Sequence, residues 1–149
     1  MTLESTIGII KPDAFQHRDK ICDMIREAGL IVSMGKITVI PKGIIDELYG
    51  HVPENVKVAL RHYMCQDLSE LLLINGEDAI ARLVKVRGEK SDSALCEEGT
   101  VRKLYGSPTI QVDEKTKYFP NALHCPMTPE EAKAQLPLFD KVSMGKYRI

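Results

Sequence analysis

The chain is 149 residues long, 44% of them hydrophobic, and carries a formal net charge of −1. This size fits one domain around one core, and the near-balanced charge excludes a general electrostatic attraction to nucleic acids or to anionic membranes. The chain start lacks the features of a signal peptide, no apolar run approaches the roughly 20 residues of a membrane span, and the widely spaced cysteines argue against a zinc site and for reduced thiols in the cytoplasm: Cys22, Cys65, Cys96 and Cys125.

The first part of the chain predicts a strand, a helix and a second strand. Residues 6–10 are mostly β-branched and predict a short buried strand, which Pro12 ends with Lys11 at its tip. Apolar residues at helical spacing over 21–28 then predict a helix with one buried face. The Ile- and Val-rich segment 30–40 predicts a long strand.

The middle of the chain alternates helical patterns with one apolar run. We expect helices over 43–50 and 54–64, followed by a buried strand over 71–74. Residues 76–78 are expected to open the next helix, since acidic residues suit a helix N-terminus. A further helix is predicted over 92–104.

The last part is predicted to be a loop, a short strand and a helix. Residues 106–120 have weak periodicity and are taken as a loop, and a short strand follows over 119–124. A capping-box spacing with proline at the first helical position starts the final helix at Thr128, and this helix is expected to end near 137–139. Without the extra helices, the order is βαββαβ, an α+β ferredoxin-like sandwich with a four-stranded antiparallel sheet and helices on one face.

Lys11 is the first candidate for phosphate chemistry. A lysine at a strand end, followed by a helix start, can direct its ammonium group at a phosphate near that helix. The alternative is a solvated strand-end lysine. The K-P-D sequence after an I-x-I-I strand favours the functional interpretation.

His124 is the second candidate. It lies in the short apolar segment Asn121-Ala122-Leu123-His124, whereas His17 and His62 are expected at the surface and His51 at a helix end. Imidazole is largely neutral and nucleophilic near neutral pH, so it can accept a phosphoryl group directly. The alternative is a buried structural histidine.

Arg102 is the third candidate. The segment Thr100-Val101-Arg102-Lys103-Leu104-Tyr105-Gly106 places two cations late in a predicted helix. A guanidinium group can hold two phosphate oxygens at once. Its alternative role is a helix C-terminal charge that interacts with the helix dipole.

Six separated segments occur in an order that resembles the nucleoside diphosphate kinase family. They are strand-Lys-Pro-Asp, Leu-Tyr-Gly-His, a Tyr-Met helix end, Gly-Glu-x-Ala-Ile, Gly-Thr-Val-Arg-x-x-Tyr-Gly and Asn-Ala-Leu-His, spread over about residues 5–139. The resemblance implies a single domain of this kind over 1–149, with the ferredoxin-like fold.

The resemblance also implies an activity and a site. The family moves the γ-phosphate of a nucleoside triphosphate to a nucleoside diphosphate by a ping-pong reaction, which would make His124 the nucleophile and a phosphohistidine. ATP and nucleoside diphosphates would be the ligands, Mg²⁺ would arrive with their phosphates, and the chain would form a homo-oligomer, a hexamer or a tetramer. The implied nucleotide-binding residues are Lys11, Tyr49, Val56, Leu60, Arg102 and Asn121.

Five positions depart from the family pattern. Val56 replaces the aromatic residue that stacks on the base, and Val84 replaces a second phosphate-binding arginine, for which Lys85 or Arg87 could substitute only if the helix is rotated or shifted. Lys90 replaces a phosphate-binding threonine, and Pro126 follows Cys125 where Gly-Ser is usual. Gln135 replaces the glutamate that orients the histidine; an amide can hold the ring tautomer but does not stabilise a positive ring as a carboxylate does.

The chain also carries an expected insertion over about 107–117. In the family this region contributes to the rim of the active site and to subunit contacts, so an insertion could cap the pocket or rebuild the oligomer.

Three functions remain open at this point. The first is an active kinase, and the second is a degenerate family member that binds a nucleotide or a partner with little turnover. The third is a ferredoxin-like regulatory or RNA-binding module, although the chain lacks the basic face and paired sheet aromatics of such modules.

Overall fold

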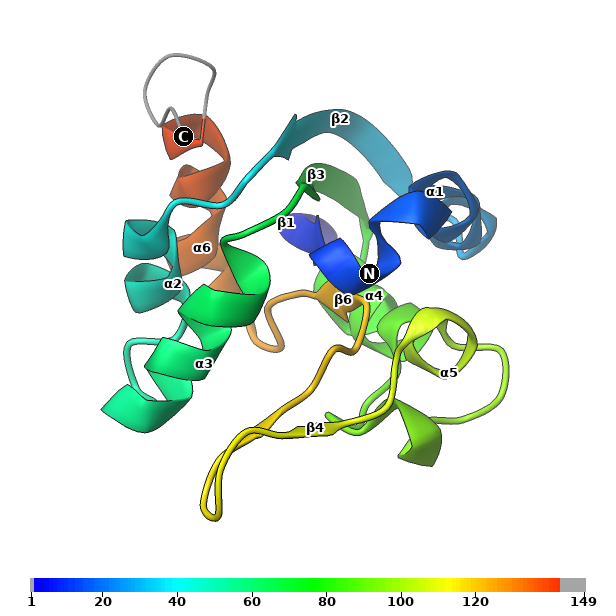
Figure 1. Ribbon diagram of the computed structural model, residues 1–149. Coiled ribbons are helices and arrows are strands. Elements are labelled where there is room, and N and C mark those ends of the chain that lie inside the picture. Colours follow the sequence, from blue (N-terminus) through cyan, green and yellow to red (C-terminus); the bar gives the residue numbers. More distant parts are fainter. Residues whose placement is uncertain (1, 143–149) are drawn as a thin grey trace.

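The computed structural model describes residues 2–142, and its centre is a four-stranded sheet (Figure 1). The strands are β1 (Leu3–Ile10), β2 (Ile31–Thr38), β3 (Ser69–Glu77) and β6 (Leu123–His124), in the spatial order β2-β3-β1-β6. All three pairings are antiparallel. The expected ferredoxin-like α+β class is therefore confirmed, and β1 lies in the centre with β6 beside it at the sheet edge.

Helices cover both faces of the sheet. One core contains residues of α1 (Arg18–Glu27) and α4 (Ala79–Arg87), and the other contains residues of α2 (Lys42–Leu48), α3 (Glu54–Met64) and α6 (Pro129–Lys141). Successive side chains of β1 point to opposite faces of the sheet and so contribute to both cores: Ile7 and Ile9 pack on one side and Ile10 on the other. The expectation of helices on one face was wrong, because the extra helices build a second core rather than decorate the surface.

The expected helix over 92–104 is also wrong. The structure has a short 3₁₀ helix, η2 (Ser93–Leu95), and a separate helix, α5 (Val101–Tyr105). Gly99 lies between them with φ +83°, a left-handed conformation that interrupts a helix. The Thr100 side chain then accepts a hydrogen bond from the backbone N–H of Lys103 and caps the start of α5.

The expected loop over 106–120 contains a β-hairpin of β4 (Ile110–Gln111) and β5 (Lys117–Tyr118). The carboxylate of Asp113 accepts hydrogen bonds from the backbone N–H groups of Lys115 and Thr116, at 2.8 and 2.9 Å. This turn chemistry closes the hairpin, although its two-residue strands are too short to produce a sequence period.

Other element boundaries moved by a few residues. Residues 76 and 77 belong to β3, which is longer than the expected 71–74 strand, and β6 covers only the end of the expected 119–124 strand. The last helix continues to Lys141 through Pro137. Burial of Leu138 and Phe139 in the core holds that final turn despite the proline.

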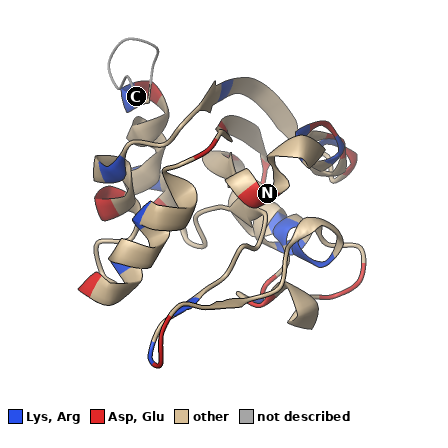
Figure 2. Cartoon of the chain, in the orientation of Figure 1, with Lys and Arg blue, Asp and Glu red and all other residues tan. Residues whose placement is uncertain are grey.

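Charges are mixed over the exposed elements. Figure 2 shows acidic and basic residues together on α1, on α2 and on the hairpin. These elements therefore present no basic surface of a single sign, of the kind that nucleic-acid binding requires. Among the described residues, no helix combines the length and apolar character needed to cross a bilayer.

Candidate functional site

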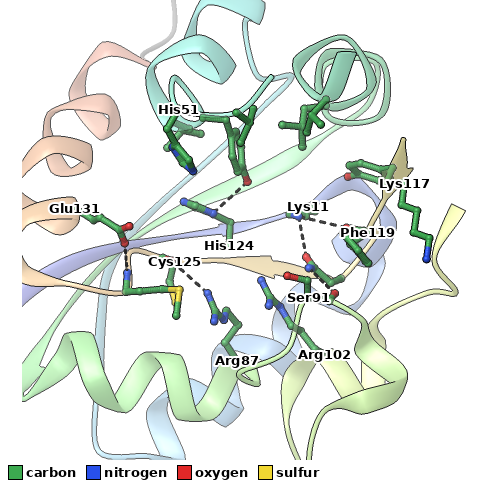
Figure 3. Close-up of a pocket in the computed structure, with 18 of the residues that line it drawn as sticks. Lys11, His51, Arg87, Ser91, Arg102, Lys117, Phe119, His124, Cys125 and Glu131 are labelled. Atoms are coloured by element: carbon green, nitrogen blue, oxygen red, sulfur yellow. Dashed lines mark hydrogen bonds between the residues drawn. The ribbon is translucent and has the colours of Figure 1, made fainter. Parts of the chain in front are cut away.

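A cavity of about 590 Å³ opens beside the junction of β1 and β6 (Figure 3). Its walls come from the end of β1, the α2–α3 segment, the end of α4, α5, the hairpin, β6 and α6. Eight residues predicted from the sequence line it together: Lys11, Tyr49, Val56, Leu60, Arg102, Asn121, His124 and Gln135. Tertiary structure thus gathers residues that are up to 124 positions apart, 135 minus 11, into one site.

Both nitrogens of the His124 ring have a hydrogen-bond partner. Nε2 lies 2.9 Å from Oε1 of Gln135, and Nδ1 lies 3.1 Å from the Tyr49 hydroxyl. An amide oxygen only accepts, so Nε2 carries the proton and donates it. Nδ1 is therefore unprotonated, and it accepts the hydrogen bond of the Tyr49 hydroxyl.

The surroundings keep this imidazole neutral. Burial lowers the pKa of His124 to about 3; the hydrogen bond that the ring donates to Gln135 opposes this shift, and the charges of Lys11, Arg87 and Arg102 add to it. The neutral ring therefore keeps a lone pair on Nδ1 throughout the physiological pH range, which is the form that a nucleophile requires.

Lys11 lies at the tip of β1 and points into the cavity. Its ammonium group donates to Oδ1 of Asn121 at 2.8 Å and to the carbonyl oxygen of Phe119 at 3.5 Å. Burial, followed by the nearby charge of Arg102, lowers the pKa of Lys11 to about 7. An anion in the cavity would reverse this shift, because it favours the protonated amine.

Two arginines complete a cluster of cations around His124 (Figure 3). Arg102 donates to the carbonyl oxygens of Lys90 at 2.8 Å and Leu123 at 3.1 Å, and its buried Nε has no hydrogen-bond partner within residues 2–142. Arg87 donates from Nη1 to the carbonyl oxygen of Cys125 at 3.4 Å. Burial lowers the pKa of Arg102 to about 10, with Arg87 as the second cause.

Arg87 was not predicted as a site residue, because the family pattern places its second phosphate-binding arginine at the position of Val84. The structure buries Val84 in the core between α4 and the sheet, whereas Arg87 at the last position of α4 lines the cavity. The signal in the sequence was the Arg87-Gly88 pair: Gly88, with φ +108°, ends the helix and makes Arg87 its last residue.

Lys90, another position that departs from the family pattern, and its neighbour Ser91 bond two of the site residues through their backbones. The backbone carbonyl of Lys90 accepts from Arg102, and that of Ser91 accepts from the Asn121 amide at 2.9 Å. Pro126 is buried. Further residues that sequence reasoning did not assign to the site also line the cavity, among them His51, Phe119 and Glu131.

The hairpin forms one wall of the cavity and packs against α3. Asn55 of α3 donates to the Thr116 hydroxyl at 2.6 Å, and the rings of Tyr63 and Tyr118 stack with centroids 4.5 Å apart. Val56 and Leu60 lie on the same helix and line the cavity. These contacts attach the expected 107–117 insertion to the pocket rim; a role for the insertion in subunit contacts stays a prediction.

The site combines a neutral histidine with three buried cations and an apolar end. Such a site is suited to a ligand that carries phosphates on an apolar group, and to attack on phosphorus by the unprotonated ring nitrogen. Among the described residues, no group of three His, Cys, Asp or Glu side chains is placed to hold a metal ion.

Comparison with known proteins identifies the family. The nucleoside diphosphate kinase family model matches residues 4–143. A nucleoside diphosphate kinase of Persephonella marina is 29% identical over 93% of this chain and 94% of its own length, and one of Geotalea uraniireducens is 31% identical over 92% and 95%. The chain belongs to the nucleoside diphosphate kinase family.

Solved structures show the same fold at lower identity. A Borrelia burgdorferi nucleoside-diphosphate kinase with bound vanadate and ADP has a TM-score of 0.81 at 18% identity and covers 99% of this chain and 91% of its own. A Halobacterium salinarum nucleoside diphosphate kinase in complex with CDP has a TM-score of 0.76 at 21% identity, over 93% and 88%. The low identity makes this chain a divergent member of the family.

The lowered pKa of Lys11 predicts a pH-dependent anion site. A lysine whose pKa is about 7 loses its charge as the pH rises through 7, so affinity for an anion should fall between pH 6 and pH 8.5. We expect this loss when inorganic pyrophosphate is titrated by calorimetry. Pyrophosphate itself gains charge over the same range, so the comparison at each pH is with Lys11→Arg, whose guanidinium stays charged. If the wild-type protein and this variant have the same pH profile, Lys11 does not titrate in this range.

Proposed function

We propose that this chain is a nucleoside diphosphate kinase that works by a ping-pong reaction through a phosphohistidine at His124. One observation supports this above all: the unprotonated Nδ1 of His124 lies in a cavity whose walls hold the cations of Lys11, Arg87 and Arg102. A neutral nucleophile surrounded by cations favours a substrate whose reacting group is an anion.

In the first half-reaction, the Tyr49 hydroxyl gives up its hydrogen bond to Nδ1, and the Nδ1 lone pair attacks the γ-phosphorus of a nucleoside triphosphate. The N–P bond forms while the bond from the γ-phosphorus to the bridging oxygen breaks, and the nucleoside diphosphate leaves with that electron pair. The proton on Nε2 stays on the ring, facing Oε1 of Gln135. The second half-reaction is the reverse, with another nucleoside diphosphate as the acceptor, so both nucleotides use one site.

The cations divide the work on the phosphates. Arg87 and Arg102 approach from α4 and α5 and would offset the charge spread over the transferring group, and Lys11 approaches from β1. Mg²⁺ would enter bound to the nucleotide phosphates as part of the substrate, which fits a site whose donors are mostly cationic.

The apolar end of the cavity would hold the base. Val56 and Leu60 offer contact without hydrogen-bonding groups, which suits a site that accepts different bases. Asn121 is proposed to contact the sugar. Its side chain is hydrogen-bonded to Lys11 and to the Ser91 carbonyl, so that contact must share or replace one of these bonds.

The hydrogen bond between His124 and Gln135 is the observation behind a second candidate function. Gln135 stands where a carboxylate would stabilise the positive ring of the phosphohistidine, so a family member that binds nucleotide with little turnover is the competing proposal. The labelling experiment below separates the two.

We further propose that the chain acts in the cytoplasm as a homo-oligomer. The edge strand β2 exposes large apolar side chains, and its outer backbone edge has no partner strand within residues 2–142. Such an edge is prone to pair with a second copy.

The phosphohistidine proposal predicts covalent labelling. Protein incubated with Mg-ATP labelled in the γ-phosphate should take up about one acid-labile phosphate per chain, because phosphoramidate bonds at histidine hydrolyse in acid. His124→Ala should abolish the label. His62→Ala is the matched control, because His62 is exposed on α3, outside the cavity, where its ring contacts Gln66 and Tyr63.

The result also decides between the competing proposals. Nucleotide binding without label would support the binding protein. Equal labelling of His124→Ala and the wild-type protein would overturn the assignment of the nucleophile.

Gln135→Glu should increase the rate of phosphotransfer. A carboxylate 2.9 Å from Nε2 would stabilise the positively charged ring in the transition state, and we expect a gain of about tenfold, in line with the effect of groups that orient a reacting histidine. The measurement is the single-turnover rate of His124 labelling, with Gln66→Glu as a control on the surface. An unchanged or lower rate would mean that the ring charge does not limit the reaction.

The oligomer proposal predicts a change in mass. Sedimentation should give a multiple of the 16.7 kDa chain mass, and Met34→Glu should shift it toward the monomer, because Met34 is 54% exposed on β2. The control is Leu104→Glu, a residue of similar exposure on α5. A monomeric wild-type protein, or a mass unaffected by Met34→Glu, would refute self-association through this strand.

A further inference from the structure

The backbone just before His124 is strained. Ala122 has φ +73°, and it is one of two non-glycine residues with positive φ in the described chain. The N–H of Leu123 donates to the carbonyl oxygen of Asn121 at 2.8 Å, so Ala122 is the central residue of a three-residue turn. With positive φ this is the rare form of the γ-turn, which costs free energy for a residue that has a Cβ atom.

This turn decides where two site residues point. In a regular strand, residues three positions apart lie on opposite faces, so Asn121 and His124 would diverge. With the turn between them, both line the cavity, while Leu123 packs into the core with α1 and α4. The strained turn at Ala122 is therefore what brings the Asn121 amide and the His124 imidazole into the same site.

Two hydrogen bonds between Ala122 and the K-P-D segment hold this residue in place. The backbone N–H of Lys11 donates to the Ala122 carbonyl oxygen at 2.8 Å, and the Ala122 N–H donates to Oδ2 of Asp13 at 3.0 Å. Both polar groups of the strained residue are thus bonded to a segment more than 100 residues away. The side chain of Ala122 is fully buried, so neither group has ready access to water as a substitute.

Asp13 is not part of the cavity wall. It lies in the 3₁₀ helix η1 (Pro12–His17), two residues after Lys11, and its Oδ2 accepts the hydrogen bond of the Ala122 N–H. Its carboxylate also interacts electrostatically with Lys11 and Arg102, but its hydrogen bond to another residue is made to the backbone of the segment that carries His124.

We propose that Asp13 is a positioning residue, which holds Ala122 in the left-handed turn and so keeps Asn121 and His124 in one site. This inference rests on the proposed phosphotransfer for its kinetic consequence, but the bond and the turn can be tested without it. Removing the carboxylate leaves a buried N–H unpaired at a strained residue, and the backbone is then expected to relax toward negative φ and move the imidazole.

The test is a rescue by glycine. Asp13→Ala should slow the labelling of His124 by Mg-ATP by about 10- to 100-fold, the range expected when a reacting group is displaced by about 1 Å. Ala122→Gly alone should label at a rate close to that of the wild type, because glycine adopts positive φ without strain. The double variant should recover most of the rate lost in Asp13→Ala, which a general loss of stability would not allow.

Two further variants sharpen the test. Asp13→Asn keeps an oxygen that can accept from the Ala122 N–H, so it should retain most of the rate. Asp23→Ala is the matched control, because Asp23 is an exposed aspartate on α1 paired with Arg26. Wild-type labelling of Asp13→Ala, or a double variant as slow as Asp13→Ala, would overturn the proposal, and so would an inactive Ala122→Gly protein.

Amide hydrogen exchange separates this proposal from the proposed function. The Ala122 amide should be protected in the wild-type protein and should exchange faster in Asp13→Ala, with no such change in Asp23→Ala. If the wild-type protein takes up no label but this difference is present, the phosphotransfer proposal fails and the positioning role stands. If the Ala122 amide exchanges equally in all three proteins, the positioning role fails.

Discussion

The short pairing between β1 and β6 is the contact on which the site depends. Only two residue pairs form it, Ile9 with His124 and Ile10 with Leu123, and the Lys11 N–H extends it by one hydrogen bond to Ala122. A slip of one residue in this register would turn His124 to the other face of the sheet. The core residues around Leu123 oppose such a slip, because it would expose that buried side chain. The position of the histidine is thus set by packing rather than by the histidine itself.

The site stores electrostatic repulsion that a bound anion would relieve. Lys11, Arg87 and Arg102 are buried around one cavity, and each contributes to lowering the pKa of His124. Burial of like charges is unfavourable, so a phosphate ligand should stabilise the folded protein as it binds. The same arrangement keeps the imidazole neutral. One set of charges therefore serves both the capture of an anion and the state of the nucleophile.

The departures from the family pattern lie at the apolar end of the cavity, at α4 and at the hydrogen-bond partner of His124. The hairpin, attached to α3 through Asn55 and Tyr63, forms a wall beside Val56, where the family places an aromatic residue. Arg87 at the end of α4 reaches the cavity although Val84 does not. Gln135 keeps the ring tautomer through its amide oxygen but lacks a negative charge. The chain thus keeps the proposed nucleophile and the surrounding cations, while the proposed base end of the cavity and the support of the imidazole differ from the family pattern.

Local patterns in the sequence were sufficient for the strands and helices whose apolar spacing is regular, such as β1 and α1, and the ordered motifs were sufficient for the family. They also indicated Lys11, Asn121 and His124, because these residues stand at strand ends in a recognisable order. Tertiary structure alone decided the rest. The side chain of Arg87 lines the cavity because of where α4 ends against the rest of the fold, and the hairpin at 110–118 depends on contacts with α3 as well as on Asp113. The positive φ of Ala122 is held by the hydrogen bond from the Lys11 N–H and by the one that Ala122 donates to Asp13. The contacts with α3 and with the K-P-D segment join residues distant in the chain, and local propensity and spacing carry no information about them.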